Sequence, residues 1–186
     1  MEKVVSIGIL ELNSVAKGIE ACDVVLKRSD IKLIDAYPVC PGKYLILIYG
    51  DVAAVESAID SGTAAAGANF VDKFVIPRVH EQILPGILGT NKINEINAVG
   101  VLETFSVASS VIAADASVKA ADVDIIEIRL AKGLGGKSFY TLTGNVSNVK
   151  AAIDAGAMTV ENEGILVNKI VLAEPHPDLK KQLLKW

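Results

Sequence analysis

The pentapeptide Ile-Gly-Ile-Leu-Glu at residues 7–11 returns as Val-Gly-Val-Leu-Glu at residues 99–103, 92 positions later. Both copies are short apolar runs of the kind that form buried strands. The same spacing continues beyond them, and residues 7–34 and 99–126 are identical at 11 of 28 positions. This self-similarity predicts two copies of one structural unit in a single chain.

The spacing between the copies increases in two steps toward the C-terminus. It is 94 between Lys43 and Lys137, and 96 between His80 and His176. Two small insertions therefore separate halves that otherwise run in parallel. We expect a first domain at residues 1–80, a short helix with a linker at residues 81–97, and a second domain at residues 98–186.

Each half has the pattern strand, helix, strand, strand, helix, strand. In the first half we expect strands at residues 3–12, 31–37, 44–49 and 70–76, with helices after Ser14 and from Val52. In the second half we expect strands at 99–104, 123–130, 138–143 and 165–172, and helices at 106–120 and 146–156. The predicted fold class is α/β (α+β): two tandem ferredoxin-like βαββαβ domains, with helices packed on one sheet.

Apolar residues in the first helix recur at spacings of three and four. Val15, Ile19, Cys22, Val25 and Leu26 are expected on one face of this helix, packed toward the sheet. Cys22 occupies the position that is alanine in the second half, so we expect a small buried residue there rather than a metal ligand.

The composition is that of a folded protein rather than a disordered one. Hydrophobic residues make up 51% and charged residues 22%, with a net charge of −4 and a pI near 5.2. The acidic balance argues against nucleic acid as a partner, because phosphate binding needs a basic face. We see no secretory signal, no apolar stretch of the ~18 residues that a membrane span needs, and no disulfide framework. The expected location is the cytosol.

The turn Val39-Cys40-Pro41-Gly42-Lys43 lies between two predicted strands. Proline and glycine together indicate a tight turn, because proline fixes φ and glycine tolerates positive φ. A cysteine at the start of such a turn is expected to be presented to its surroundings rather than packed. One thiol cannot hold a metal centre, but three copies around a threefold axis can.

The matching loop of the second half is the glycine-rich stretch 132–138, with sequence KGLGGKS. It imitates a P-loop, but the first glycine of that motif is Ala131 here, and the residues from Ser138 onward read as a strand rather than a helix. The dinucleotide-binding pattern fails as well. We interpret the stretch as a flexible loop.

Several runs resemble bacterial microcompartment shell proteins. They are Ile7–Glu11, Asp23 with Lys27, Pro-Gly-Lys before a strand, Gly50-Asp51-Val52 and Val75–His80, with matches in both halves. The resemblance implies a tandem-domain shell subunit with unpermuted strand order. It also implies a homotrimer that forms a pseudohexameric tile with a central pore. Two stretches are the expected pore lining: Val39, Cys40, Pro41, Gly42 and Lys43, and Gly133, Leu134, Gly135 and Gly136.

The Cys40 turn further resembles the trimeric shell protein of propanediol-utilisation compartments. There the corresponding cysteine from three subunits is understood to hold a [4Fe–4S] cluster in the pore. The resemblance implies one cluster per trimer here, ligated by Cys40 of each subunit, with electron or cluster transfer across the shell to lumenal redox enzymes. The chain has no CxxC pair, so the spacing of its cysteines alone does not predict a cluster.

Two other functions remain open from the sequence. One is a metal-free shell tile whose pore passes small metabolites. The other is a ferredoxin-like regulator that binds a ligand and forms a discrete oligomer. An enzyme is not expected, because no nucleophile–base pair or carboxylate dyad is visible and Glu11 and Glu103 each end a strand.

The resemblance places Lys27, Lys119 and Arg78 at the edge of the tile, in lateral contact with other shell proteins. Without the resemblance, both lysines would be interpreted as ordinary helix residues that face solvent. Arg78 has no counterpart of the same charge in the second half, where Glu174 occupies its place. Alternate edges of the tile are therefore expected to differ in charge.

Overall fold

The computed structural model describes residues 6–161 and 164–184. The chain divides into two compact units, residues 1–79 and residues 80–186. Each unit holds one copy of the repeat. The expected start of the first strand at residues 3–5 lies outside the described residues.

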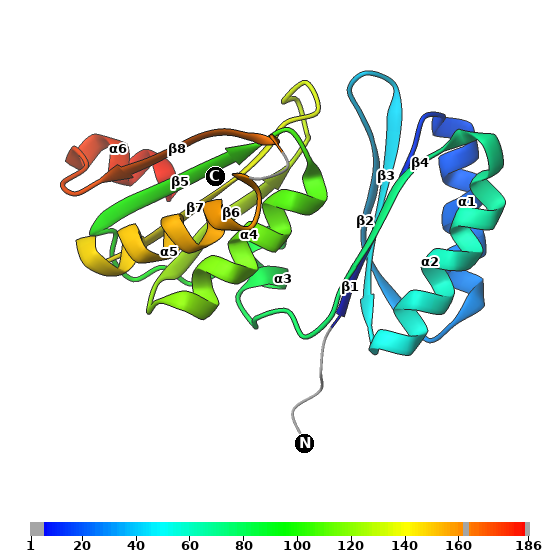
Figure 1. Ribbon diagram of the computed structural model, residues 1–186, viewed down its shortest axis with the longest axis horizontal. Helices are drawn as coiled ribbons and strands as arrows, with labels where there is room; N and C mark the ends of the chain where they lie inside the picture. The colour runs from blue at the N-terminus through cyan, green and yellow to red at the C-terminus, as the bar shows by residue number, and fades with distance from the viewer. Residues whose placement is uncertain (1–5, 162–163, 185–186) are drawn as a thin grey trace. The chain divides into compact units, whose positions relative to one another are not determined.

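The first unit is a four-stranded antiparallel sheet in the order β2-β3-β1-β4. Helices α1 and α2 lie side by side on one face of it (Figure 1). Ser14 caps α1 by accepting a hydrogen bond from the Lys17 N–H, as its position before the helix predicts. The elements are β1 (Ser6–Leu12), α1 (Val15–Arg28), β2 (Ile31–Val39), β3 (Lys43–Gly50), α2 (Val52–Ala66), the 3₁₀ helix η1 (Gly67–Asn69) and β4 (Phe70–Ile76).

The second unit repeats this plan with the sheet order β6-β7-β5-β8 and helices α4 and α5 (Figure 1). Its elements are α3 (Ile83–Leu88), β5 (Ala98–Thr104), α4 (Val107–Ala120), β6 (Asp124–Leu130), β7 (Ser138–Gly144), α5 (Val146–Met158), β8 (Leu166–Leu172) and α6 (Pro177–Leu183). The predicted βαββαβ order is confirmed in both halves. Helix α6 was not predicted, although Pro177 at its first position is a typical start signal.

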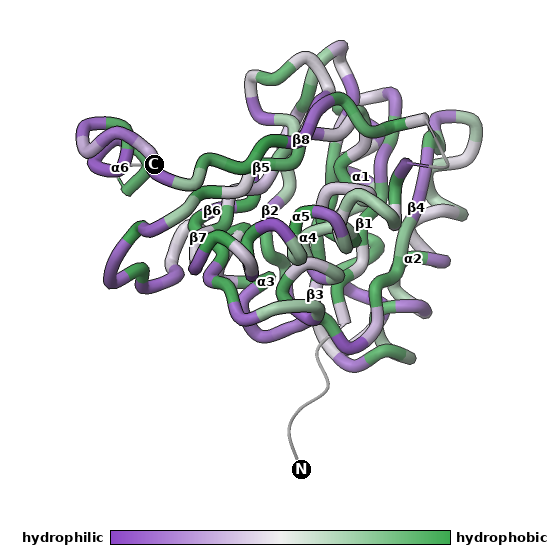
Figure 2. Tube along the Cα trace, turned by 60° about the vertical axis from the view of Figure 1, so that its left-hand side comes forward, coloured by the Kyte–Doolittle hydropathy of each residue, from purple (hydrophilic) through white to green (hydrophobic). Residues whose placement is uncertain are grey.

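The core of the first unit is thin because small residues let the helices approach the sheet closely. A Cβ placed on Gly18 of α1 would overlap the Tyr44 side chain of β3, and one on Gly62 of α2 would lie 2.8 Å from Leu10 of β1. Tyr44 and Leu10 are themselves buried. In the second unit, the central strand β5 corresponds to β1, and Figure 2 shows that the trace along β5 is mainly hydrophobic.

This close approach corrects the expected inner face of α1. The buried residues are Gly18, Ala21, Cys22 and Val25, so the prediction for Cys22 and Val25 is right. Val15, Ile19 and Leu26 are instead exposed, Ile19 to 57%. The expectation was wrong because large apolar side chains cannot fit where a glycine already touches the sheet.

The second unit solves the same packing problem with other residues. Ser110 and Ser138 replace the Gly18–Tyr44 pair, and both are buried. Two residues further along the strand, Tyr140 replaces Ile46, and its hydroxyl lies 2.7 Å from Ser117 Oγ, where the first unit has Val25. Burial raises the pKa of Tyr140, although the hydrogen bond to Ser117 opposes the shift. A larger side chain on the strand is thus matched by a smaller one on the helix.

The segment before β5 covers the outer edge of strand β6. The Gln82 side chain accepts a hydrogen bond from the Ile125 N–H at 2.7 Å and donates one to the Val123 carbonyl at 3.1 Å. Asn91 Nδ2 donates to the Ile125 carbonyl at 2.9 Å. Side-chain amides here take the place of a further strand at the start of β6, where the backbone groups of Val123 and Ile125 are paired within the unit.

We predict that Gly18→Ala lowers the free energy of unfolding of the first unit by ~1–3 kcal/mol, because the new methyl group overlaps the Tyr44 ring. Urea unfolding followed by circular dichroism measures the loss. In a Tyr44→Ser background, which copies the second unit, the same substitution should cost close to nothing. An equal cost in both backgrounds would contradict the assigned contact.

Candidate functional site

The Cys40 turn is the tip of the hairpin formed by β2 and β3. Its backbone closes through a hydrogen bond of 3.0 Å from the Gly42 N–H to the Val39 carbonyl. Gly42 has φ of +83°, with open space around the position of a Cβ. Cys40, Pro41 and Gly42 are exposed, whereas the side chain of Val39 is buried. The thiol is therefore presented at the tip, while Val39 anchors the base of the turn.

An ion pair fixes the return strand of this hairpin. Lys43 Nζ lies 3.0 Å from Glu11 Oε1, and both side chains are only partly exposed, at 34% and 22%. Glu11 is opposite Leu45 in the β1–β3 register, so Lys43 is its diagonal neighbour across the strands. The lysine charge is thus held at the base of the turn.

The glycine-rich loop between β6 and β7 has the same support. Lys137 Nζ lies 2.6 Å from Glu103 Oε1. Ala131, Gly133, Gly135 and Gly136 have positive φ, which gives this loop a different path from the Cys40 turn. Gly133 and Gly135 are exposed, and Leu134 and Gly136 partly so. Strand β7 starts at Ser138, which agrees with the rejection of a P-loop.

Glu11 and Glu103 are predicted from the sequence only to end strands, and their ion pairs with Lys43 and Lys137 are not predicted. A signal was present, since each glutamate and its lysine are both kept in the repeat. The strand register was needed to show that they face each other.

The described part of the chain brings no group of three or more histidine, cysteine, aspartate or glutamate side chains together as a metal site. Cys22 is buried, and burial raises the pKa of its thiol, with Asp23 adding to the shift. Cys40 is exposed. Among the described residues, Cys40 is therefore the cysteine that is open to a ligand outside the chain.

Glu127 is a buried carboxylate of the second unit. Its Oε2 accepts a hydrogen bond of 3.0 Å from Arg129, while its Oε1 has no partner among the described residues. Burial raises the pKa of Glu127, and Arg129 opposes that shift. Glu127 and Arg129 thus form a partly buried ion pair, which differs from the two facing carboxylates of glycoside hydrolysis.

Each predicted edge lysine forms an ion pair with an aspartate four residues earlier in the same helix. Lys27 Nζ lies 2.6 Å from Asp23, and Lys119 Nζ lies 2.5 Å from Asp115. Lys27 is 74% exposed and Lys119 is 44% exposed. Arg78 is exposed, with φ of +53° directly after Pro77.

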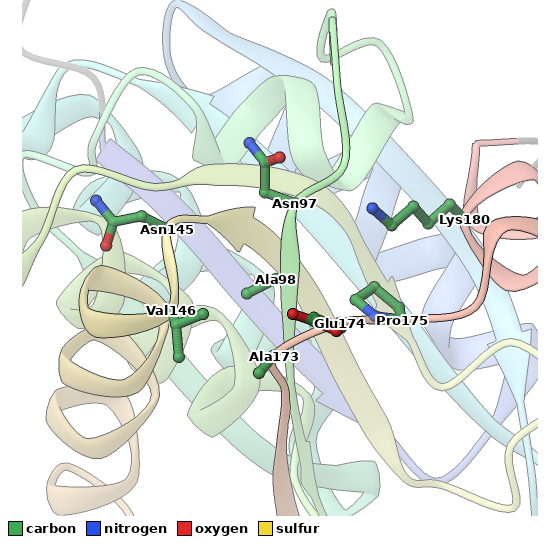
Figure 3. Close-up of a pocket in the computed structure, with 8 residues that line it drawn as sticks. All are labelled: Asn97, Ala98, Asn145, Val146, Ala173, Glu174, Pro175 and Lys180. Atoms are coloured by element: carbon green, nitrogen blue, oxygen red, sulfur yellow. The ribbon is translucent and has the colours of Figure 1, made fainter.

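Glu174, the counterpart of Arg78, borders a hollow of about 380 Å³ in the second unit. Figure 3 shows its lining, which comes from the start of β5, the start of α5, the end of β8 and helix α6. Lys180 is the cation among the lining residues, and no cysteine or histidine is among them. The lining residues are Asn97, Ala98, Asn145, Val146, Ala173, Glu174, Pro175 and Lys180.

The two histidines have structural contacts, as their positions after strands suggest. The His80 N–H donates to Asp115 Oδ1 at 2.7 Å. His176 Nδ1 accepts from the Asp178 N–H at 3.2 Å and so caps helix α6. The two residues occupy equivalent places at the ends of the two repeats.

We predict that Glu11→Gln lowers the free energy of unfolding by about 0.5–1 kcal/mol, because a partly exposed ion pair is lost. The loss should shrink in 1 M salt, where the Debye length falls to about 3 Å. Urea unfolding at low and high salt measures both. The charge-swapped pair Glu11→Lys with Lys43→Glu is the control and should recover most of the loss; a salt-independent loss would contradict an electrostatic origin.

The BMC domain family model matches residues 6–79 and 98–175. The chain is 41% identical over 180 residues to the bacterial microcompartment shell protein PduT of Citrobacter freundii, covering 97% of this chain and 98% of that protein. A microcompartment protein from Desulfitobacterium hafniense superimposes with a TM-score of 0.93 at 47% identity, covering 95% of this chain and 98% of that one.

A fused permuted hexameric shell protein of the RMM microcompartment shares the fold at a TM-score of 0.59 and 20% identity, covering 85% of this chain and 82% of that one. No helix within residues 6–161 and 164–184 is long and apolar enough to cross a membrane. The chain belongs to the BMC-domain family and is a structural, non-enzymatic component of a bacterial microcompartment shell.

Proposed function

We propose that this shell tile is a homotrimer in which Cys40 of each subunit ligates one shared [4Fe–4S] cluster at a central pore. The turn Val39–Lys43 and the loop Gly133–Gly136 line that pore. The observation that carries the proposal is the exposed thiol at the tip of a short hairpin. The likeness to PduT over nearly the whole chain supports the tile itself.

The donor set fits such a cluster only when three copies meet. Fe–S clusters are ligated by cysteine thiolates, and each chain offers one exposed cysteine. Three thiolates on a threefold axis leave one iron without a protein ligand, open to water or a small molecule. The Lys43–Glu11 ion pair keeps the lysine ammonium tied to the base of the turn, so Cys40 is carried on a fixed support.

A bound cluster supplies one-electron redox chemistry at the pore. The role of the chain is to hold the thiol at the rim and to close the tile around it. We infer that electrons, or clusters, are exchanged there with lumenal redox enzymes.

The proposed tile also makes lateral contacts with other shell proteins through its edges. Lys27, Lys119 and Arg78 are exposed, as edge contacts require. Glu174 at the place of Arg78 gives alternate edges opposite charge, which favours contacts between unlike edges.

The experiment is anaerobic purification followed by measurement of iron, sulfide and the reduced-state EPR spectrum. We expect about four irons per three chains, the stoichiometry of one shared [4Fe–4S] cluster. Cys40→Ser should abolish both the iron and the signal. Cys22→Ala is the matched control and should leave them intact, because Cys22 is buried and the repeat already has alanine there.

The alternatives give different results. Iron-free protein that remains trimeric after attempted cluster reconstitution would leave a metal-free tile whose pore passes small metabolites. A ligand-binding regulator would not assemble into sheets or tubes at high concentration, which electron microscopy tests. The comparisons favour the shell tile over the regulator.

A further inference from the structure

The segment that follows the first repeat docks on the second unit through contacts at two neighbouring places. At the first, the His80 N–H donates to Asp115 Oδ1 of α4 at 2.7 Å. At the second, the Gln82 side chain pairs with the backbone of β6 at Val123 and Ile125. Ile125 is completely buried, as is Ile83 at the start of α3.

The surface that receives this segment exists twice in the chain. Asp115, Val123 and Ile125 correspond, 92 residues earlier, to Asp23, Ile31 and Leu33. The first-unit copy is uncovered: Leu33 is 41% exposed where Ile125 is fully buried. The side chain of Asp23 is 60% exposed, against 11% for Asp115.

The segment that docks also exists twice. His176, Asp178 and Leu179 correspond, 96 residues later, to His80, Gln82 and Ile83. Leu179 is 40% exposed, whereas Ile83 is completely buried. The tail after β8 cannot use the surface of α4 and β6 in its own unit, because the segment after β4 already occupies it.

We propose that residues 176–179 of one copy dock on Asp23, Ile31 and Leu33 of a second copy. The exposed segment of one copy then meets the exposed surface of the next, as the equivalent segment and surface already meet within the second unit. The contact joins unlike surfaces, so it is heterologous and must close into a ring or continue as a filament. The contact itself does not depend on the proposed function. Only the number of copies in the ring, three, rests on the proposed trimer.

The hydrogen bonds of the proposed contact follow from the equivalent contact within the second unit, between residues 80–83 and the surface of α4 and β6. The His176 N–H donates to the Asp23 carboxylate, and Leu179 covers Leu33 as Ile83 covers the β6 side. Asp178 can accept the Leu33 N–H as Gln82 accepts that of Ile125, but a carboxylate cannot donate to the Ile31 carbonyl. Residues 176–179 therefore make two hydrogen bonds in this contact, whereas residues 80–83 make three in the second unit.

Helix α6 supports this placement. Leu183 near its end is buried with Ile96 and Val99 of its own unit. The helix is therefore anchored at its far end, while its first turn presents Asp178 and Leu179 to solvent.

Cysteine cross-linking tests the proposal in the full chain. The background is Cys22→Ala with Cys40→Ser, which removes both native thiols. Leu33→Cys and Asp178→Cys are introduced in separate chains, which are co-expressed and oxidised. We expect a disulfide between the two different chains, identified by mass spectrometry of the linked peptides. Either variant expressed alone should give no cross-link, because unlike surfaces do not bring two identical positions together.

A second measurement uses the chain with both native cysteines, Cys22 and Cys40. Asp23→Asn should raise the dissociation constant of the oligomer by about tenfold, because a hydrogen bond to a charged group is weakened. It should leave the unfolding of the isolated chain nearly unchanged. Asp115→Asn is the matched control; its hydrogen-bond partner lies in the same chain, so it should lower the melting temperature instead.

The outcomes separate the contact from the trimer. A trimer by light scattering without the mixed disulfide, and with wild-type association of Asp23→Asn, would overturn the contact and leave the trimer standing. A monomeric wild-type protein would overturn both. Cross-links in either single variant would show a like-with-like interface and would also overturn the contact.

Discussion

The close approach of helix to sheet is the constraint on which both halves of this protein depend. In the first unit Gly18 and Gly62 bring α1 and α2 against Tyr44 and Leu10 of the sheet with no room for a further carbon atom. In the second unit Ser110 replaces Gly18 and Ser138 replaces Tyr44, while Tyr140 replaces Ile46. Because interiors are densely packed, volume lost at one position must return at a neighbour. The duplicated fold has therefore diverged in its core residues while keeping the same order of strands and helices.

The loops diverge more than the layers that carry them. Both loops are supported at the same place, where a lysine at the start of a strand pairs with a glutamate of the central strand. Beyond that support one half presents a cysteine and the other a run of glycines with positive φ. A fixed base with a variable tip lets one scaffold carry different chemistry at its two loops. In the proposed trimer, the two kinds of tip alternate around one pore.

Much of the fold was predictable because duplication doubled the evidence for each element. The βαββαβ order, the Ser14 cap and the buried Cys22 all follow from apolar spacing and from local turn chemistry. The inner face of α1 was not predictable in full, since Val15, Ile19 and Leu26 satisfy the same spacing but lie outside. The spacing of apolar residues shows that a helix has an apolar side. The size of the side chains on the sheet decides which residues of that side can pack against it.

The sequence by itself determined the duplication, the strand and helix order, the turn that presents Cys40 and the family resemblance. These depend on local backbone preferences and on residues that recur at fixed spacing. Only the tertiary structure paired Lys43 with Glu11, and only it showed that Gln82 occupies the edge of β6 while Leu33 at the equivalent edge is exposed. Such contacts join residues distant in sequence, and they form because charges need partners and buried backbone groups need hydrogen bonds. Strand register and packing decide which distant residues meet.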